Sequence, residues 1–215
     1  MNRSSRRVLG PLLVGLALLA AACSDGGGHA TPERATVGRE QLRTDMRQLW
    51  EDHVTWTRVV IISAAANLPD FQTAVDRLLK NQEDIGNAVK PFYGDVAGNE
   101  LTSLLKDHIA IAGELLVAAR SGDGPAQTDA ATRWYANADD IAGFLAKANP
   151  EHWPQAEMSK MMHDHLDLTL EEATARLKGD WAGDVAAYDR VVSEILKMSD
   201  MLTDGLVAQF PGRFS

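Results

Sequence analysis

From Arg39 onward, apolar residues recur at steps of three and four, which is the spacing of an amphipathic helix. Proline or glycine interrupts the pattern at intervals of about 25–30 residues, as expected where successive helices are joined by short turns. The pattern predicts helices over 39–66, 70–90, 95–121, 126–148, 154–178 and 181–209. The predicted fold class is therefore all-α, an antiparallel up-and-down bundle of about five to six helices. No self-similar period stands out, so a repeat solenoid is not predicted.

Two histidines, His53 and His108, fall inside the apolar stripes of their predicted helices. The stripes that contain them are formed by Leu42, Met46, Leu49, Trp56 and Val60 and by Leu101, Leu104, Ile111 and Leu115. A buried imidazole without a hydrogen-bonding partner costs free energy, so other polar side chains are expected beside each histidine. Both positions lie near helix midpoints, which share one level in an up-and-down bundle. The sequence therefore predicts an interior polar layer.

Other polar residues are candidates for the same layer. Asn137 lies in the apolar face of its predicted helix with Asp140 at the edge, and Glu83 lies near the margin of helix 70–90. Imidazole, carboxylate and amide donors from facing helices suit a transition-metal ion such as Fe, Zn or Cu. The candidate metal ligands are His53, His108, His165, Glu83, Asn137 and Asp140. The alternative is a hydrogen-bonded network of the same residues that sets helix register and binds nothing.

Residues 158–165 bring thioether and imidazole groups together. Met161, Met162 and His165 fall on one side of a regular helix, whereas His163 points away. Soft thioethers suit Cu(I), but methionines on one helical face more often fill a core, and this is the favoured interpretation.

A capping-box pattern follows this segment. Thr169 matches the N-cap position and Glu172 the third helical position, which predicts a helix break near Asp167. His165 would then lie at a helix junction, so its place in the layer depends on whether that break exists.

The N-terminus predicts export. Three arginines within residues 3–7 precede an apolar run over 8–22, which is typical of a signal peptide covering 1–22. The stretch 18–24 resembles the lipobox of bacterial lipoproteins, although Ala20 stands where that family most often has leucine. This resemblance implies that Cys23, the only cysteine, carries lipid and becomes the first mature residue. The alternative is an ordinary cleaved signal with an incidental cysteine.

Beyond the signal, the sequence predicts a flexible tether over 23–38 and one helical domain over 39–215. The whole chain has a net charge of −9, and residues 1–22 contain three arginines and no acid, so their removal makes it −12. Nucleic acid and anionic headgroups would repel such a chain. The expected location is the extracytoplasmic face of a membrane. The chain is expected to contact the membrane through the lipid alone, and the sequence assigns no protein partner.

Common nucleotide and acyl-transfer motifs are missing from the sequence. It contains no Gly-x-x-x-x-Gly-Lys-Ser/Thr loop and no Gly-x-Gly-x-x-Gly motif, so the usual nucleotide sites are not predicted. It also lacks the Gly-x-Ser-x-Gly elbow of the hydrolases. No catalytic residue is assigned.

Four strings carry a resemblance: 49–58 (LWEDHVTWTR), 81–86 (NQEDIG), 133–141 (RWYANADDI) and 165–169 (HLDLT). They resemble a family of uncharacterised bacterial helical proteins whose members carry automated labels such as glycosyltransferase or acetylglutamate kinase. The resemblance implies an all-helical fold. It does not extend to those reactions here, because the chain lacks the α/β alternation and phosphate-cradling loops that they require.

The sequence thus predicts a membrane-anchored extracytoplasmic lipoprotein that binds a metal ion or small ligand through its interior polar layer. One alternative is a structural or partner-binding scaffold with a register-setting buried network. Another is a metal-dependent enzyme of unknown reaction, which would need an open coordination position.

Overall fold

The computed structural model describes residues 38–214, and every regular element in that range is helical. The elements are α1 (Arg39–Ala66), α2 (Phe71–Ser121), α3 (Gly124–Ala148), α4 (Gln155–Lys178), α5 (Trp181–Gln209) and the short 3-10 helix η1 (Pro211–Arg213). This confirms the predicted all-α class. The predicted signal peptide, Cys23 and all but the last residue of the predicted tether lie outside the described residues.

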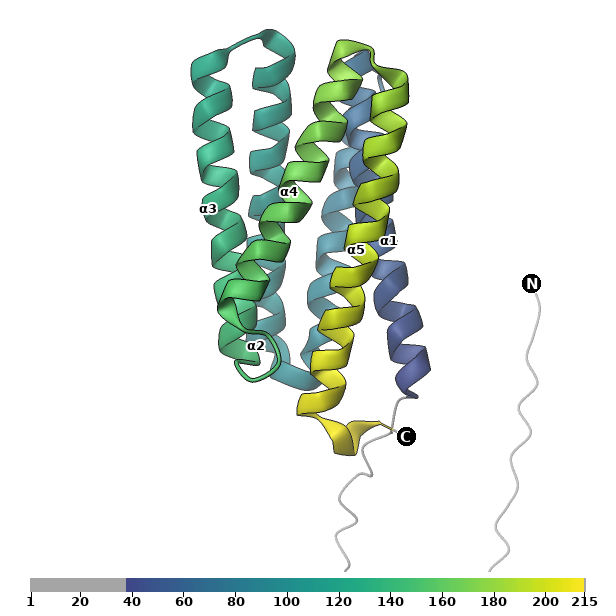
Figure 1. Cartoon of the computed structure of the whole chain (residues 1–215), viewed down its shortest axis with the longest axis vertical. Helices are drawn as coiled ribbons and strands as arrows, with labels where there is room; N and C mark the ends of the chain where they lie inside the picture. The colour runs from purple at the N-terminus through teal and green to yellow at the C-terminus, as the bar shows by residue number, and fades with distance from the viewer. Residues whose placement is uncertain (1–37, 215) are drawn as a thin grey trace, which may run out of the picture. The chain divides into compact units, whose positions relative to one another are not determined.

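The helices run alternately up and down, each beside its neighbour in sequence, and α5 returns to pack against α1 (Figure 1). α2 reverses direction at Gly94, whose φ of 86° and ψ of 171° interrupt the helix. A positive φ of this size favours glycine because it has no Cβ. The predicted interruption between helices 70–90 and 95–121 is therefore confirmed, and α2 supplies two antiparallel halves, 71–93 and 95–121.

The two halves of α2 pack closely because two glycines face each other. A Cβ on Gly86 would lie 2.6 Å from the carbonyl oxygen of Gly98, and a Cβ on Gly98 would lie 2.6 Å from that of Gly86. These separations are shorter than van der Waals contact. A larger residue at either position would push the two backbones apart.

The remaining helices end where the sequence indicates. Asn67, Gly122 and Gly179 take left-handed conformations at the C-termini of α1, α2 and α4. Asp123 and Asp180 then cap the next helices, since their carboxylates accept hydrogen bonds from the backbone N–H groups of Ala126 and Gly183. These local signals explain why the predicted and observed bounds agree closely.

The predicted break near Asp167 is wrong, because α4 is continuous from Gln155 to Lys178. The Thr169 hydroxyl donates to the carbonyl oxygen of His165 at 2.9 Å, a bond that a threonine makes inside a helix. Glu172 accepts a hydrogen bond from Arg58 of α1 at 2.7 Å. The apparent capping box therefore serves other contacts, and His165 lies in the middle of an unbroken helix.

Buried apolar residues form three clusters between the helices, and the largest contains Met158 and Met162, which are 0% and 5% exposed. Met161 packs against this cluster half-buried. This agrees with the interpretation that these methionines fill the core. Within residues 38–214, no helix combines the length and apolarity needed to cross a bilayer.

Candidate functional site

The described chain consists of three helical hairpins that share one residue pattern. The first hairpin is α1 with the first half of α2, the second is the other half of α2 with α3, and the third is α4 with α5. The first helix of each contains Asp-His followed by an aliphatic residue: Asp52-His53-Val54, Asp107-His108-Ile109 and Asp164-His165-Leu166. The second helix of each contains an arginine, then a polar residue four positions later, then an apolar one after four more: Arg77, Asn81 and Ile85; Arg133, Asn137 and Ile141; Arg190, Glu194 and Met198.

In each hairpin, the histidine bonds a side chain 29 residues later on the second helix. In the second and third hairpins this is the polar residue of the pattern, whereas in the first it is Gln82, the neighbour of Asn81. The expectation that no period stands out is therefore wrong. The repeating unit is a whole hairpin of about 56 residues. Few of its positions hold the same kind of residue in all three hairpins, which makes the repeat hard to see in the sequence.

The three histidines come together in the interior. His53, His108 and His165 are 3%, 3% and 4% exposed, and all three line the same cleft. The ring centroids of His53 and His165 are 5.7 Å apart, and the ring of His108 lies against that of Trp134 at 5.2 Å. The predicted interior layer thus exists, and each hairpin contributes one imidazole to it.

Each imidazole is held through its Nδ1 atom. His108 Nδ1 lies 2.7 Å from Asn137 Oδ1, while Asn137 Nδ2 donates to the carbonyl oxygen of Leu104 and so fixes the orientation of the amide. His165 Nδ1 lies 3.2 Å from Glu194 Oε2. Both partner atoms are acceptors, so both rings donate from Nδ1.

His53 meets an amide nitrogen instead. Gln82 Nε2 lies 3.2 Å from His53 Nδ1, 2.9 Å from the carbonyl oxygen of Leu78 and 3.1 Å from Asn81 Oδ1. The two hydrogens of this amide nitrogen are shared among three neighbours, and the two closer ones are oxygens.

Burial keeps two of these rings neutral. Desolvation lowers the pKa of His53 well below its ordinary value, and the nearby His165 and His108 act in the same direction. Desolvation also lowers the pKa of His108 to about 3, against the raising effect of its hydrogen bond to Asn137.

The cleft extends from the histidines toward the C-terminal ends of α1 and α4, where the α2–α3 and α4–α5 hairpins diverge (Figure 1). Its volume is about 70 Å³, which is room for on the order of five water molecules. The walls are mainly aliphatic, with side chains such as Ile61, Ile109, Leu116 and Leu170. The cleft can thus enclose a small apolar group and present it with three imidazoles.

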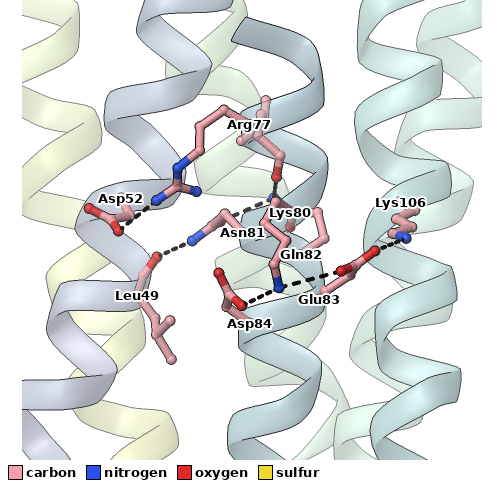
Figure 2. Close-up of polar contacts among 10 residues, drawn as sticks. Leu49, Asp52, Arg77, Lys80, Asn81, Gln82, Glu83, Asp84 and Lys106 are labelled. Carbon is pink, nitrogen blue, oxygen red and sulfur yellow. Dashed lines mark hydrogen bonds and ion pairs between the residues drawn. The ribbon is translucent and has the colours of Figure 1, made fainter. Parts of the chain in front are cut away.

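The other predicted site residues are distributed differently. Asn137 belongs to the layer as the partner of His108. Glu83 does not, because its side chain is 41% exposed and pairs with Lys106 at 2.6 Å. Figure 2 shows it directed across to Lys106 on the second half of α2, whereas Asn81 reaches back to the carbonyl oxygen of Leu49. Asp140 is exposed and lies in a shallow hollow on the outer surface.

Metal binding stays a prediction. Within residues 38–214, no three His, Cys, Asp or Glu side chains are arranged to hold a metal ion. His163 lies on the surface beside Asp139, with its Nε2 atom 3.1 Å from the carboxylate.

A cluster of buried charges beside the histidine layer escaped the sequence reasoning. Arg58 of α1 contacts Glu172 of α4 at 2.7 Å and Asp184 of α5 at 2.9 Å, and both acidic side chains are 1% exposed. Arg176 also contacts Asp184, at 3.2 Å. Burial raises the pKa of Glu172 to about 7, although Arg58 acts to lower it. The cluster ties three helices together at the level of the cleft.

Glu194 was missed as well. It is 29 residues after His165, the same separation as between His108 and Asn137. That spacing is the signal in the sequence that could have identified it.

The fold and the cleft define an all-α bundle with an internal histidine site. Comparison with protein-family models, with curated proteins and with solved structures gave no match.

Proposed function

We propose that this protein is a lipid-anchored, extracytoplasmic binding module whose histidine cleft takes up a small, mostly apolar molecule with a hydroxyl head. The observation that carries the proposal is the set of three imidazoles, one from each hairpin, at the floor of an aliphatic cleft. Apolar walls with a few convergent polar groups are typical of small-molecule sites.

The imidazoles favour a hydroxyl. A hydroxyl donates one hydrogen bond and accepts others, so it can donate to the unprotonated Nε2 of neutral His108 and complements either tautomer of the other two rings. An ether can only accept, and a hydrocarbon does neither. Either would leave buried polar atoms unpaired, which costs free energy.

A transition-metal ion held by the same Nε2 atoms is the second candidate. The observation that favours it is the side chain behind each ring, because metal-ligating histidines usually donate their other N–H to a carboxylate or carbonyl group. His108 and His165 fit this pattern. His53 does not, because its Nδ1 atom faces the amide nitrogen of Gln82 and not a carboxylate or carbonyl group.

The anchor is proposed from the sequence around Cys23. Intact-mass spectrometry of protein extracted from bacterial membranes is expected to find a chain that begins at Cys23 and carries the added mass of acyl groups. A mature chain that begins at another residue, or that carries no added mass, would contradict lipidation.

Phenol, anisole and toluene test the cleft because they share a ring and differ in the head. We expect calorimetric titration of the full chain, with Cys23→Ser to avoid lipid, to show phenol binding about 10- to 100-fold more tightly than either analogue. His108→Leu should remove most of this preference. His163→Leu is the matched control, because this imidazole is 39% exposed and lies outside the cleft.

Equal affinity for phenol and toluene would contradict hydroxyl recognition. If none of the three compounds binds, and protein purified without a His-tag contains stoichiometric metal that His108→Leu removes, the metal candidate replaces this one.

A further inference from the structure

A second hollow lies on the outside of the bundle, between the two antiparallel halves of α2. Its volume is about 560 Å³, and its walls include Phe71 and Leu79 from the first half and Val117 from the second. The Val117 side chain is 47% exposed. We call this hollow the α2 groove. It presents an apolar surface to the solvent.

The α2 groove and the histidine cleft share a wall, because Val60, Ile109 and Gly113 line both of them. Gly113 adds no side chain to this wall, and outside its own stretch of helix no atom lies within 4 Å of where its Cβ would be. The backbone gives no reason for a glycine here, since Gly113 lies inside a helix without a positive φ, where glycine costs stability. The wall therefore lacks a side chain at Gly113 and has unfilled space beside it.

The cleft alone is too small for a long ligand. Its volume of about 70 Å³ holds on the order of five water-sized groups, which corresponds to a hydroxyl oxygen and about four carbons. The apolar part of a longer molecule has to continue beyond the cleft. The α2 groove offers it an aliphatic surface on the other side of a shared wall.

The charges around both hollows disfavour an anionic ligand. Neither lining contains a lysine or an arginine, and the ionisable residues of the α2 groove are the acids Glu114 and Asp123. Moving a carboxylate out of water without a cation beside it costs free energy. A hydroxyl head and an uncharged tail avoid this cost.

We propose that the ligand is a straight-chain alcohol whose hydroxyl lies among the imidazoles and whose alkyl chain crosses the shared wall at Gly113 into the α2 groove. This inference rests on the proposed function and names its ligand class. Each methylene that reaches the groove leaves water for an apolar surface, which strengthens binding. A ligand confined to the cleft would gain nothing from a longer chain.

Straight-chain alcohols of different length test this inference. We expect calorimetric titration of the full chain, with Cys23→Ser, to show binding that strengthens about threefold for each methylene added between n-butanol and n-octanol, or about 100-fold overall. The alkyl chain of n-butanol fills the cleft, so the added methylenes have to lie in the α2 groove. Octanoate has a chain of the same length and a charged head, and it should bind about 10-fold more weakly than n-octanol, or weaker still.

Two variants locate the alkyl chain. Val117→Asp places a charge in the α2 groove and leaves the lining of the cleft intact, so it should weaken n-octanol about 10-fold and leave n-butanol unchanged. Gly113→Leu fills the space at the wall, and leucine favours a helix more than glycine does. In this variant n-octanol should bind no more tightly than n-butanol. Val96→Asp is the matched control, because this valine of α2 is 82% exposed and lines neither hollow.

Three results would overturn the inference and leave the binding function standing, provided that phenol still binds more tightly than toluene. They are an affinity that stops rising beyond n-butanol, wild-type affinity for n-octanol in both Val117→Asp and Gly113→Leu, and octanoate binding as tight as that of n-octanol. Equal weakening of n-octanol by Val96→Asp would also contradict it. If neither the alcohols nor phenol bind, the inference and the proposed function are both wrong.

Discussion

Replacing Arg58 with methionine is expected to lower the free energy of unfolding by about 3–5 kcal/mol, the usual cost of breaking a buried ion pair from one side. Glu172 and Asp184 are 1% exposed and both contact this guanidinium. Without it, Asp184 keeps only Arg176 among its cationic partners in the described chain, and Glu172 keeps none. Methionine preserves most of the side-chain volume, so the loss should come from charge and not from packing. Urea unfolding followed by circular dichroism measures it.

Arg47→Met is the matched control on the same helix. Arg47 also pairs with an acid of α5, Asp200, but its side chain is 45% exposed. Exposed ion pairs contribute little to stability because solvent screens them, so this variant should remain close to wild type. Similar losses in the two variants would show that burial does not set the strength of the Arg58 cluster.

Lowering the pH from 7 to 4 is expected to remove about 3 kcal/mol of stability through His108 alone. The pKa of this imidazole falls from 6.5 to about 3 on folding, so at pH 4 the unfolded chain binds a proton that the folded chain does not. The stabilisation is complete above pH 6.5 and is lost as the pH falls toward 3. The loss of unfolding free energy is about 1.4 kcal/mol for each pH unit below 6.5, which gives about 3 kcal/mol at pH 4. His53 acts in the same direction.

Glu172 acts in the opposite direction and has to be separated from His108. Its pKa rises from 4.5 to about 7 on folding, so the folded chain gains stability from this group as the pH falls through that window. The comparison is therefore between wild type and His108→Gln, each unfolded in urea at pH 7 and pH 4. The variant should lose about 3 kcal/mol less than wild type over this range. Parallel pH curves would show that His108 takes up a proton in the folded state.

The histidine layer shows which residues' burial can be predicted from the apolar spacing of single helices. His53 and His108 lie in apolar stripes, which predicts that they are buried, and they are. Glu83 and Asp140 lie at stripe margins, where the pattern leaves burial and exposure equally open. Glu83 is half-buried and pairs with Lys106, and Asp140 is exposed. A residue at the edge of an apolar stripe is buried or exposed according to the rotation of its helix and the neighbouring helix that it faces. The spacing of residues within one helix does not contain this information.

Thr169 and Glu172 illustrate the same limit inside a helix. Their spacing fits a capping box, yet the partner of Glu172 is Arg58, more than a hundred residues away. A local pattern cannot distinguish a helix cap from a buried ion pair, because the ion pair depends on a cationic side chain of an adjacent helix.

The sequence alone determined the helices, most of their ends and the burial of His53 and His108, since these depend on residues a few positions apart. Tertiary structure decided that three imidazoles share one cleft, that Gln82, Asn137 and Glu194 face their Nδ1 atoms, and that Arg58 contacts two buried acids. Those outcomes depend on which helices face each other and at what rotation, and on contacts between residues 29 or more positions apart.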